Sequence, residues 1–182
     1  PESVAKGLEF AIADWSLAQV AKLRGEAEDY AYFLKRSNSF SHYFDKDLQF
    51  MRGVDAQGKF RPGVFDPFHS AHLANDYTEG NAWQYTWLVP QNIKGFMDLF
   101  GGEQPFVQKL DSLFVVEGDL GADASPEISG LIGQYAHGNE PSHHIIYFYT
   151  LAGEPTKAAD RVRDVYDMMY SDQPDGLSGN ED

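Results

Sequence analysis

The sequence DYTEGNAWQYTWLVPQNIKGFMDLFGG, residues 76–102, decides how the rest of the chain is interpreted. Trp83 and Trp87 are four residues apart, so both indoles would lie on one face of a helix. Pro90 cannot continue a helix because it lacks an amide donor, so a new helix is expected after it and is expected to end at Gly101. The stretch therefore predicts two short helices that pack through large aromatic side chains.

The same stretch also has the composition of a small-ligand pocket. Glu79, Asn81, Gln84 and Tyr85 are polar or amphipathic groups next to the two indoles. Apolar walls with a few convergent polar groups are typical of sugar sites. Burial beside the indoles would favour the protonated form of Glu79, which a general acid requires. The alternative interpretation is that the aromatic residues belong only to the core.

Apolar residues recur at helical spacing along most of the chain, with glycine and proline at the expected ends. The first two predicted helices would lie antiparallel, and residues 50–68 have the glycines and prolines of a hairpin-like loop that packs on the body. The fold class is therefore predicted to be all-α, with about seven helices and almost no strand. Besides those in residues 76–102, helices are expected over residues 3–23, 26–50, 104–114 and 155–170, and from residues 126 and 141 onward.

Composition excludes several classes of function. The chain has 14 Lys and Arg against 28 Asp and Glu, a net charge of −14, which argues against nucleic-acid binding because phosphate contacts need clustered basic side chains. No run of about 18 apolar residues is present, so no membrane-spanning helix is predicted. The absence of cysteine excludes disulfide bonds, thiolate metal sites and a cysteine nucleophile. The Gly- and Asp-rich residues 172–182 are typical of a loop within a longer protein.

Three polar loops, residues 78–85, 137–144 and 174–182, are the candidate sites. Neither a zinc-peptidase HExxH pattern nor an EF-hand is present, and no GxSxG motif supports a serine nucleophile. In the second loop, Asn139 and Glu140 offer oxygen ligands, which suit a hard cation such as calcium better than zinc. The alternative is that this loop only caps helices and that the acidic third loop is a solvated turn.

Three segments closely resemble the catalytic-domain motifs of glycoside hydrolase family 92, the calcium-dependent exo-acting α-mannosidases. They are TEGNAWQYTWLVPQNIKGFMDLFGG, GLIGQYAHGNEPSHHIIYFY and PDGLSGNED, in the family's order, and the loop LQFMRGVDAQGKF extends the resemblance over most of residues 50–182. The resemblance implies an N-terminal β-sandwich followed by an (α/α)6 barrel, with the active site between them. Residues 1–182 would then be a fragment of one helical catalytic domain, a partial (α/α)6 barrel without the sandwich and the C-terminal remainder.

The resemblance also implies roles for individual residues. From the residues alone, either Asp182 or Glu181 could stay ionised in its Gly-rich polar loop and act as a base. By resemblance, Glu79 matches the general acid and Asp182 the general base. The loop with Asn139 and Glu140 matches the region around calcium, and Gly138 stands where some α-1,2-specific members carry Glu. The sugar subsites are expected to be lined by Trp83, Gln84, Tyr85, Trp87, His137, His143, His144 and Asn180.

The predicted function is hydrolysis of terminal α-linked mannose from mannosides or N-glycans, by a calcium-dependent inverting mechanism in a periplasmic or secreted protein. The predicted partners are therefore sugar substrates, with no nucleic acid and no membrane, and no oligomeric state is predicted. Two alternatives stay open: an all-α carbohydrate-binding or scaffold segment without turnover, and another (α/α)6 glycosidase with a different sugar preference.

Overall fold

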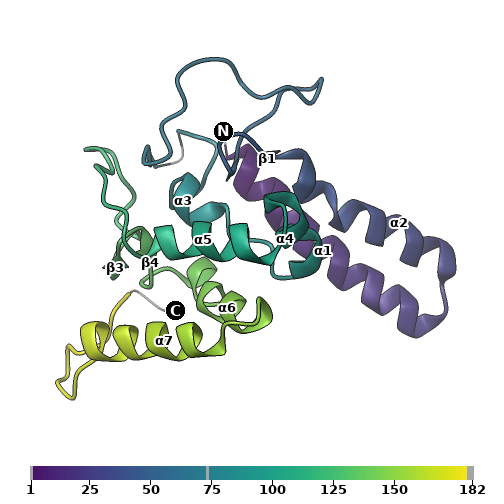
Figure 1. Ribbon diagram of the computed structural model, residues 1–182. Coiled ribbons are helices and arrows are strands. Elements are labelled where there is room, and N and C mark those ends of the chain that lie inside the picture. The colour runs from purple at the N-terminus through teal and green to yellow at the C-terminus, as the bar shows by residue number, and fades with distance from the viewer. Residues whose placement is uncertain (1, 73, 180–182) are drawn as a thin grey trace.

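The computed structural model describes residues 2–72 and 74–179. Helices α1 (Ser3–Arg24) and α2 (Ala27–Ser37) form an antiparallel hairpin that extends away from the rest of the molecule (Figure 1). Gly25 ends α1 with a left-handed φ of 76°, and its amide donates to the Lys22 carbonyl at 3.1 Å. The first predicted helix and its antiparallel partner are confirmed.

The second predicted helix is wrong beyond Ser37, where α2 ends. Ser37 Oγ and Asn38 Nδ2 both donate to the Leu34 carbonyl at 2.8 Å. Hydrogen bonds from short polar side chains to nearby backbone carbonyls compete with the helical ladder. The chain then forms a 3-10 helix, Ser39–His42, and leaves the helical path.

Two short strands follow the 3-10 helix instead of further helical turns. β1 (Phe44–Asp45) pairs antiparallel with β2 (Phe50–Met51). In the turn between them the Asp45 carboxylate accepts hydrogen bonds from the amides of Asp47 and Leu48. The apolar residues of this segment are thus buried by a hairpin rather than by a helix face.

The predicted hairpin-like loop after Phe50 is confirmed. Val54 and Phe60 form an isolated antiparallel bridge, and the Asp55 carboxylate accepts from two amides of the intervening turn. Phe65, later in the loop, contacts the ring of Phe50 at a centroid distance of 5.6 Å. The loop therefore packs on the body.

Three helices form over residues 82–113, and the second and third of them match the prediction closely. They are α3 (Ala82–Tyr85), α4 (Ile93–Phe100) and α5 (Glu103–Leu113). The side chain of Asn92 caps α4 at its first turn, and Gly101 ends α4 with φ of 94°. Polar caps and a left-handed glycine are what the sequence offers at these two places.

The helix predicted from residue 126 onward is wrong, because the chain forms a second hairpin there. β3 (Leu131–Ile132) pairs antiparallel with β4 (Tyr135–Ala136) through a two-residue turn. Gly133 in this turn has φ of 59°, and a Cβ at this glycine would lie 2.6 Å from the Leu113 carbonyl oxygen. A left-handed glycine in a two-residue connection favours a hairpin over a helix.

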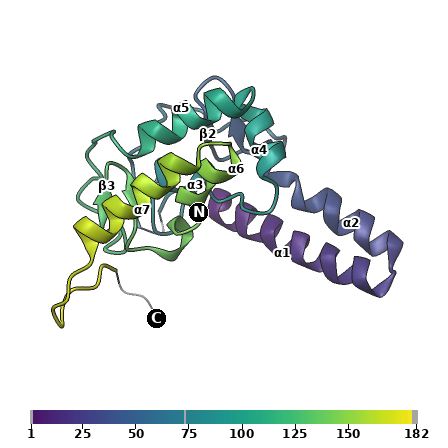
Figure 2. The ribbon, with the colours of Figure 1, turned by 60° about the horizontal axis from the view of Figure 1, so that its bottom comes forward.

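The C-terminal part of the described chain is helical again. The helix expected from residue 141 is replaced by two 3-10 helices, Glu140–Ser142 and Ile145–Tyr147, followed by a short α6 (Phe148–Leu151). The last helix, α7 (Pro155–Met169), is confirmed. Figure 2 shows α6 and α7 next to α4 and α5, with the α1–α2 hairpin extending from this body. The helix-rich class is confirmed, and the two small sheets are its exceptions among the described residues.

An aromatic cluster around Trp87 forms the centre of the core. Trp87 is fully buried and stacks on Phe100 with the rings 6° from parallel. The edges of Phe96 and Phe106 meet its indole at centroid distances of 6.0 and 5.5 Å. These rings belong to α4 and α5, so the indole joins both helices to the segment that follows α3.

Replacing Trp87 with Ala is expected to lower the free energy of unfolding by about 3–5 kcal/mol, because it leaves a large cavity among rings that cannot close it. Urea denaturation followed by circular dichroism measures the change. Trp15→Ala is the matched control, since Trp15 is 37% exposed and should cost clearly less. Equal losses in the two variants would contradict this assignment of the core.

Candidate active site

Glu79 lies in an irregular segment directly before α3 and is half-buried. Its backbone amide donates to Tyr85 Oη at 3.5 Å. Asn139, from the loop after β4, donates through Nδ2 to the Glu79 carbonyl at 3.3 Å and to Glu79 Oε2 at 3.5 Å. Two of the three polar loops singled out in the sequence therefore meet at this carboxylate.

The cavity beside Glu79 is small. Its volume is about 10 Å³, close to the space that one water molecule needs. A sugar ring does not fit in it, so a substrate would have to approach Glu79 from its exposed side. The cavity is lined by Glu79, Gln84, Tyr85, Leu88, Ala136, Asn139, Pro141 and Ser142.

The two indoles are not at Glu79, which corrects the expected pocket. α3 ends at Tyr85, so Trp87 lies beyond the helix and does not share a helical face with Trp83. Trp83 meets the edge of Phe50 at 4.8 Å, and the Lys109 ammonium lies 4.3 Å from its ring. Trp87 lies in the core described above. Neither indole lines the cavity beside Glu79, whereas Gln84 and Tyr85, two other expected subsite residues, do.

Lys109 is itself a consequence of this packing. Its ammonium lies 3.5 Å from the centre of the Phe50 ring, and burial lowers its pKa to about 8. The faces of aromatic rings attract a cation, but this attraction is weaker than the hydration that the ammonium group loses on burial. One face of the Trp83 indole is therefore occupied by a side chain of α5.

His137 and His143 lie together, away from the Glu79 cavity. The Nδ1 of His137 is 2.9 Å from Tyr135 Oη and its Nε2 is 2.7 Å from Tyr170 Oη. His143 Nε2 donates to the His137 carbonyl at 2.9 Å. Burial raises the pKa of Tyr135, so its hydroxyl stays protonated and can donate to His137. This group borders a separate cavity of about 230 Å³ that reaches the side of α7.

His144 has a structural position in the described residues. Its Nε2 donates to the Trp87 carbonyl at 2.9 Å, and its ring meets the edge of Phe148. Burial lowers the pKa of His144 below its ordinary value of 6.5, and the charge of His143 lowers it further. The hydrogen bond to the Trp87 carbonyl acts in the opposite direction and raises the pKa. Through these two contacts, the His144 side chain holds the segment after α3 against α6.

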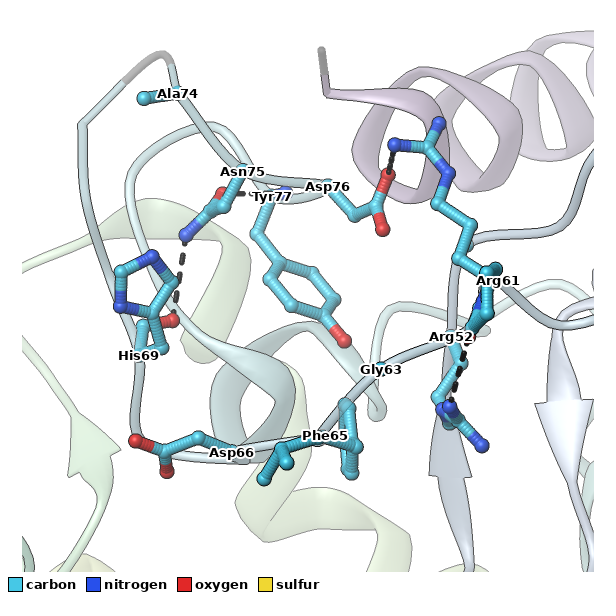
Figure 3. A pocket seen from close by; sticks show the side chains of 13 residues that line it. Arg52, Arg61, Gly63, Phe65, Asp66, His69, Ala74, Asn75, Asp76 and Tyr77 are labelled. Carbon is cyan, nitrogen blue, oxygen red and sulfur yellow. Dashed lines mark hydrogen bonds and ion pairs between the residues drawn. The ribbon is translucent and has the colours of Figure 1, made fainter.

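A third cavity, of about 300 Å³, lies between the loop that carries Arg61 and the segment before Glu79 (Figure 3). Some of its polar groups are paired with each other. Arg61 forms an ion pair with Asp76 at 3.1 Å, and Asn75 donates to the His69 carbonyl. None of the predicted site residues lines it.

The expected calcium ligands are not assembled by the described residues alone. Asn139 is buried with its Nδ2 turned to Glu79, and Glu140 is exposed. Within residues 2–72 and 74–179, no three His, Asp or Glu side chains come together as a metal site. Calcium takes about six to eight oxygen ligands, which include amide and backbone carbonyl oxygens, so a site at Asn139 and Glu140 would need further ligands.

Two predicted residues, Asn180 and the general base Asp182, lie outside the described residues.

Gly138 lies within the described residues, and a Cβ there would lie 2.1 Å from Ser129 Oγ and 3.1 Å from the Ser129 backbone. A side chain at this position would require the Ser129 hydroxyl to turn away and the Ser129 backbone to shift slightly.

Sequence reasoning missed Gln134, which is almost fully buried in the turn between β3 and β4. Its side-chain oxygen accepts a hydrogen bond from Asn81 Nδ2 at 2.9 Å. The residue stands within the second motif but carries no charge and no aromatic ring, so only its position in a glycine-rich turn could have drawn attention to it.

The pKa of His144 predicts a pH dependence of stability. The unfolded chain takes up a proton near pH 6.5 while the folded chain does not, so stability is complete above that pH and falls as the pH drops toward the folded pKa. Replacing His144 with Gln should reduce the stability lost between about pH 7 and pH 5, measured by urea denaturation. The exposed His42→Gln is the control. The same pH dependence in His144→Gln and the unmodified protein would refute the assignment.

Comparison with known proteins places the chain, with its helix-rich fold and its carboxylate held between two loops, among the glycoside hydrolases. It belongs to glycosyl hydrolase family 92, whose catalytic-domain model matches residues 1–182, and the resemblance of its motifs to that family is confirmed. None of the described helices is long and apolar enough to cross a membrane.

Three relatives give the extent of the similarity. A family GH92 alpha-mannosidase from Bacteroides thetaiotaomicron, solved in complex with mannoimidazole, is 41% identical with a TM-score of 0.91, over 98% of this chain and 24% of that chain. A GH92 inverting mannosidase from the same species is 31% identical with a TM-score of 0.81, over 98% and 25%. An uncharacterized secreted glycosidase from Arthroderma benhamiae is 25% identical over 99% of this chain and 24% of the relative. The chain thus spans about a quarter of the length of these relatives.

Proposed function

We propose that this chain carries the general acid of an exo-acting, inverting α-mannosidase that removes terminal α-linked mannose from mannosides or N-glycans. The observation that carries the proposal is the Glu79 carboxylate, half-buried and held by Asn139 where two family motifs meet. Family membership over the whole chain supports it, as does the relative that binds mannoimidazole.

In the proposed reaction, Glu79 gives a proton to the glycosidic oxygen while a water attacks the opposite face of the sugar. Asn139 donates to Oε2, which leaves Oε1 as the oxygen that carries the proton toward the substrate. The hydrogen bond to Tyr85 holds the backbone of Glu79, so that the carboxyl group alone turns. Asp182 is proposed as the base, about 6.5–9.5 Å from Glu79, because a water must fit between the base and the sugar.

We also propose that the helices are part of an (α/α)6 barrel and that residues 1–182 are one fragment of that domain. The consecutive pairs α1–α2, α4–α5 and α6–α7 are the helical hairpins that such a toroid repeats. The outer face of α1 supports this, because Phe10, Leu17 and Val20 are 64, 48 and 53% exposed at helical spacing. Neighbouring helices of the domain would cover this stripe. A periplasmic or secreted location is proposed as well, supported by the relative from Arthroderma benhamiae, which is named a secreted glycosidase.

The linkage proposal follows from Gly138. Some family members with α-1,2 specificity are expected to carry Glu there, and a Cβ at Gly138 would crowd Ser129, with its Oγ at 2.1 Å and its backbone at 3.1 Å. The preferred substrates are therefore proposed to be mannosides linked otherwise than α-1,2.

The function is tested on the full-length protein with defined α-linked mannose disaccharides, and the first-formed anomer is read by proton NMR. Free β-mannose is expected first, because an inverting reaction replaces an α bond by a β hydroxyl. The Glu79→Gln variant should lose about 10²–10⁴-fold in rate on these substrates. α-Mannose as the first product would overturn the inverting mechanism, and no mannose release would favour a sugar-binding role without turnover.

An activated aryl α-mannoside supplies the control for the acid role. Its leaving group departs without a proton, so Glu79→Gln should affect it much less than the disaccharides. Equal losses on both substrates would mean that Glu79 serves folding or binding rather than proton transfer. Glu117→Gln, an exposed carboxylate outside the site, is the matched control and should leave both rates unchanged.

Calcium dependence is proposed from the family resemblance, with Asn139 and Glu140 among the ligands. Excess chelator should abolish mannose release while circular dichroism stays unchanged, since Asn139 and Glu140 lie at the start of a short 3-10 helix outside the aromatic core. Added calcium should raise the melting temperature of the chelated protein, which gives a readout independent of activity. Full activity in chelator, or loss of helical signal, would count against the proposal.

A further inference from the structure

Three buried amide side chains connect the segment that carries Glu79 to the turn between β3 and β4. Asn81, Gln84 and Gln134 are 0, 8 and 2% exposed. The Oε1 of Gln134 accepts from Asn81 Nδ2 at 2.9 Å and from Gln84 Nε2 at 3.4 Å. Gln84 Nε2 also donates to the Gln134 backbone carbonyl at 2.8 Å. Gln134 therefore accepts hydrogen bonds from both partners at once.

The same two partners build the turn that carries Glu79. Asn81 caps α3, because its Oδ1 accepts from the amides of Trp83 and Gln84. In return, Gln84 Oε1 accepts from the Asn81 amide at 2.8 Å, which completes a capping box. Only Gly80 separates this box from Glu79, so the box determines where the backbone of Glu79 lies.

The backbone of Gln134 is also held from the side away from the Glu79 segment. Its backbone amide donates to the Leu113 carbonyl at 2.8 Å, at the end of α5. Gly133 packs against the same carbonyl, where any side chain would collide with it. The turn between β3 and β4 is therefore anchored to α5, and α5 belongs to the aromatic core.

We propose that Gln134 is a positioning residue for the reaction, because it transmits the position of α5 through Asn81 and Gln84 to the Glu79 carboxyl group. This inference rests on the proposed function of Glu79 as the general acid. Gln134 lines none of the cavity beside Glu79, so it touches neither the acid nor a substrate there. Its effect is on the direction of proton transfer, which fails when the acid is displaced by a fraction of an ångström.

The variant Gln134→Met tests this in the full-length protein, since methionine has nearly the same shape and no strong acceptor. We expect kcat on a disaccharide to fall about 10–100-fold with little change in KM. The rate on an activated aryl α-mannoside should stay within about threefold, because that substrate needs no proton. A merely structural residue would lower both rates together or only the melting temperature.

A second variant approaches the network from the other side. Gln84→Glu keeps the oxygen that completes the capping box but removes the donor to the Gln134 carbonyl, and it should show the same contrast between substrates. Gln108→Met, on the exposed side of α5, is the matched control and should leave both rates unchanged.

The outcomes separate this inference from the proposed function. Equal losses on the two substrates, unchanged kinetics, or failure of both Gln134→Met and Gln84→Glu to fold at low temperature would overturn the positioning role. Glu79→Gln is measured in parallel. If Glu79→Gln shows the contrast between substrates and Gln134→Met does not, only the positioning role is wrong; if Glu79→Gln shows no contrast, the acid role itself fails.

Discussion

The structure around Glu79 depends on one constraint, which is that three buried amides must all be hydrogen-bonded. An unpaired buried amide costs about 1–3 kcal/mol, so Asn81, Gln84 and Gln134 can satisfy each other in very few arrangements. Apolar packing is not directional and tolerates small shifts. The aromatic core therefore supplies stability, while the amides determine the angle at which the turn leaves α3. A carboxyl group that transfers a proton depends more on a fixed orientation, which the amides supply, than on the stability that the core supplies.

The fold was predictable from the sequence where a helix has both an apolar face and a marked end. α1 ends at Gly25 and α4 at Gly101, and both glycines adopt the left-handed conformation that ends a helix. The prediction failed where apolar spacing continued through a local break. Asn38 and Ser37 stop α2 by hydrogen bonds to their own helix, and Gly133 turns an apolar run into a hairpin. Neither event changes the spacing of the apolar residues, so periodicity does not reveal it.

The candidate site was predictable only in part, because its contacts join residues distant in the sequence. Motif resemblance indicated Glu79 and Asn139, and the structure brings these two together across 60 positions. The spacing of Trp83 and Trp87 suggested a shared face beside the acid, yet α3 is too short to create one. Gln134 is 53 positions from Asn81, and nothing in the sequence distinguishes a buried glutamine from an exposed one.

The placement of Glu79 also limits how a substrate can reach it. On its inner side the cavity has the volume of about one water molecule, and Asn139 already occupies Oε2. A sugar must therefore meet the carboxyl group from the exposed side, where Oε1 remains for the glycosidic oxygen. In the proposed mechanism the described residues then supply the proton and its direction, while the walls that enclose the sugar come from residues beyond them. This division explains why the acid needs so rigid a support. A group that faces an open side has no substrate contacts to orient it beforehand, so its orientation has to be established from behind, through α3 and the turn at Gln134.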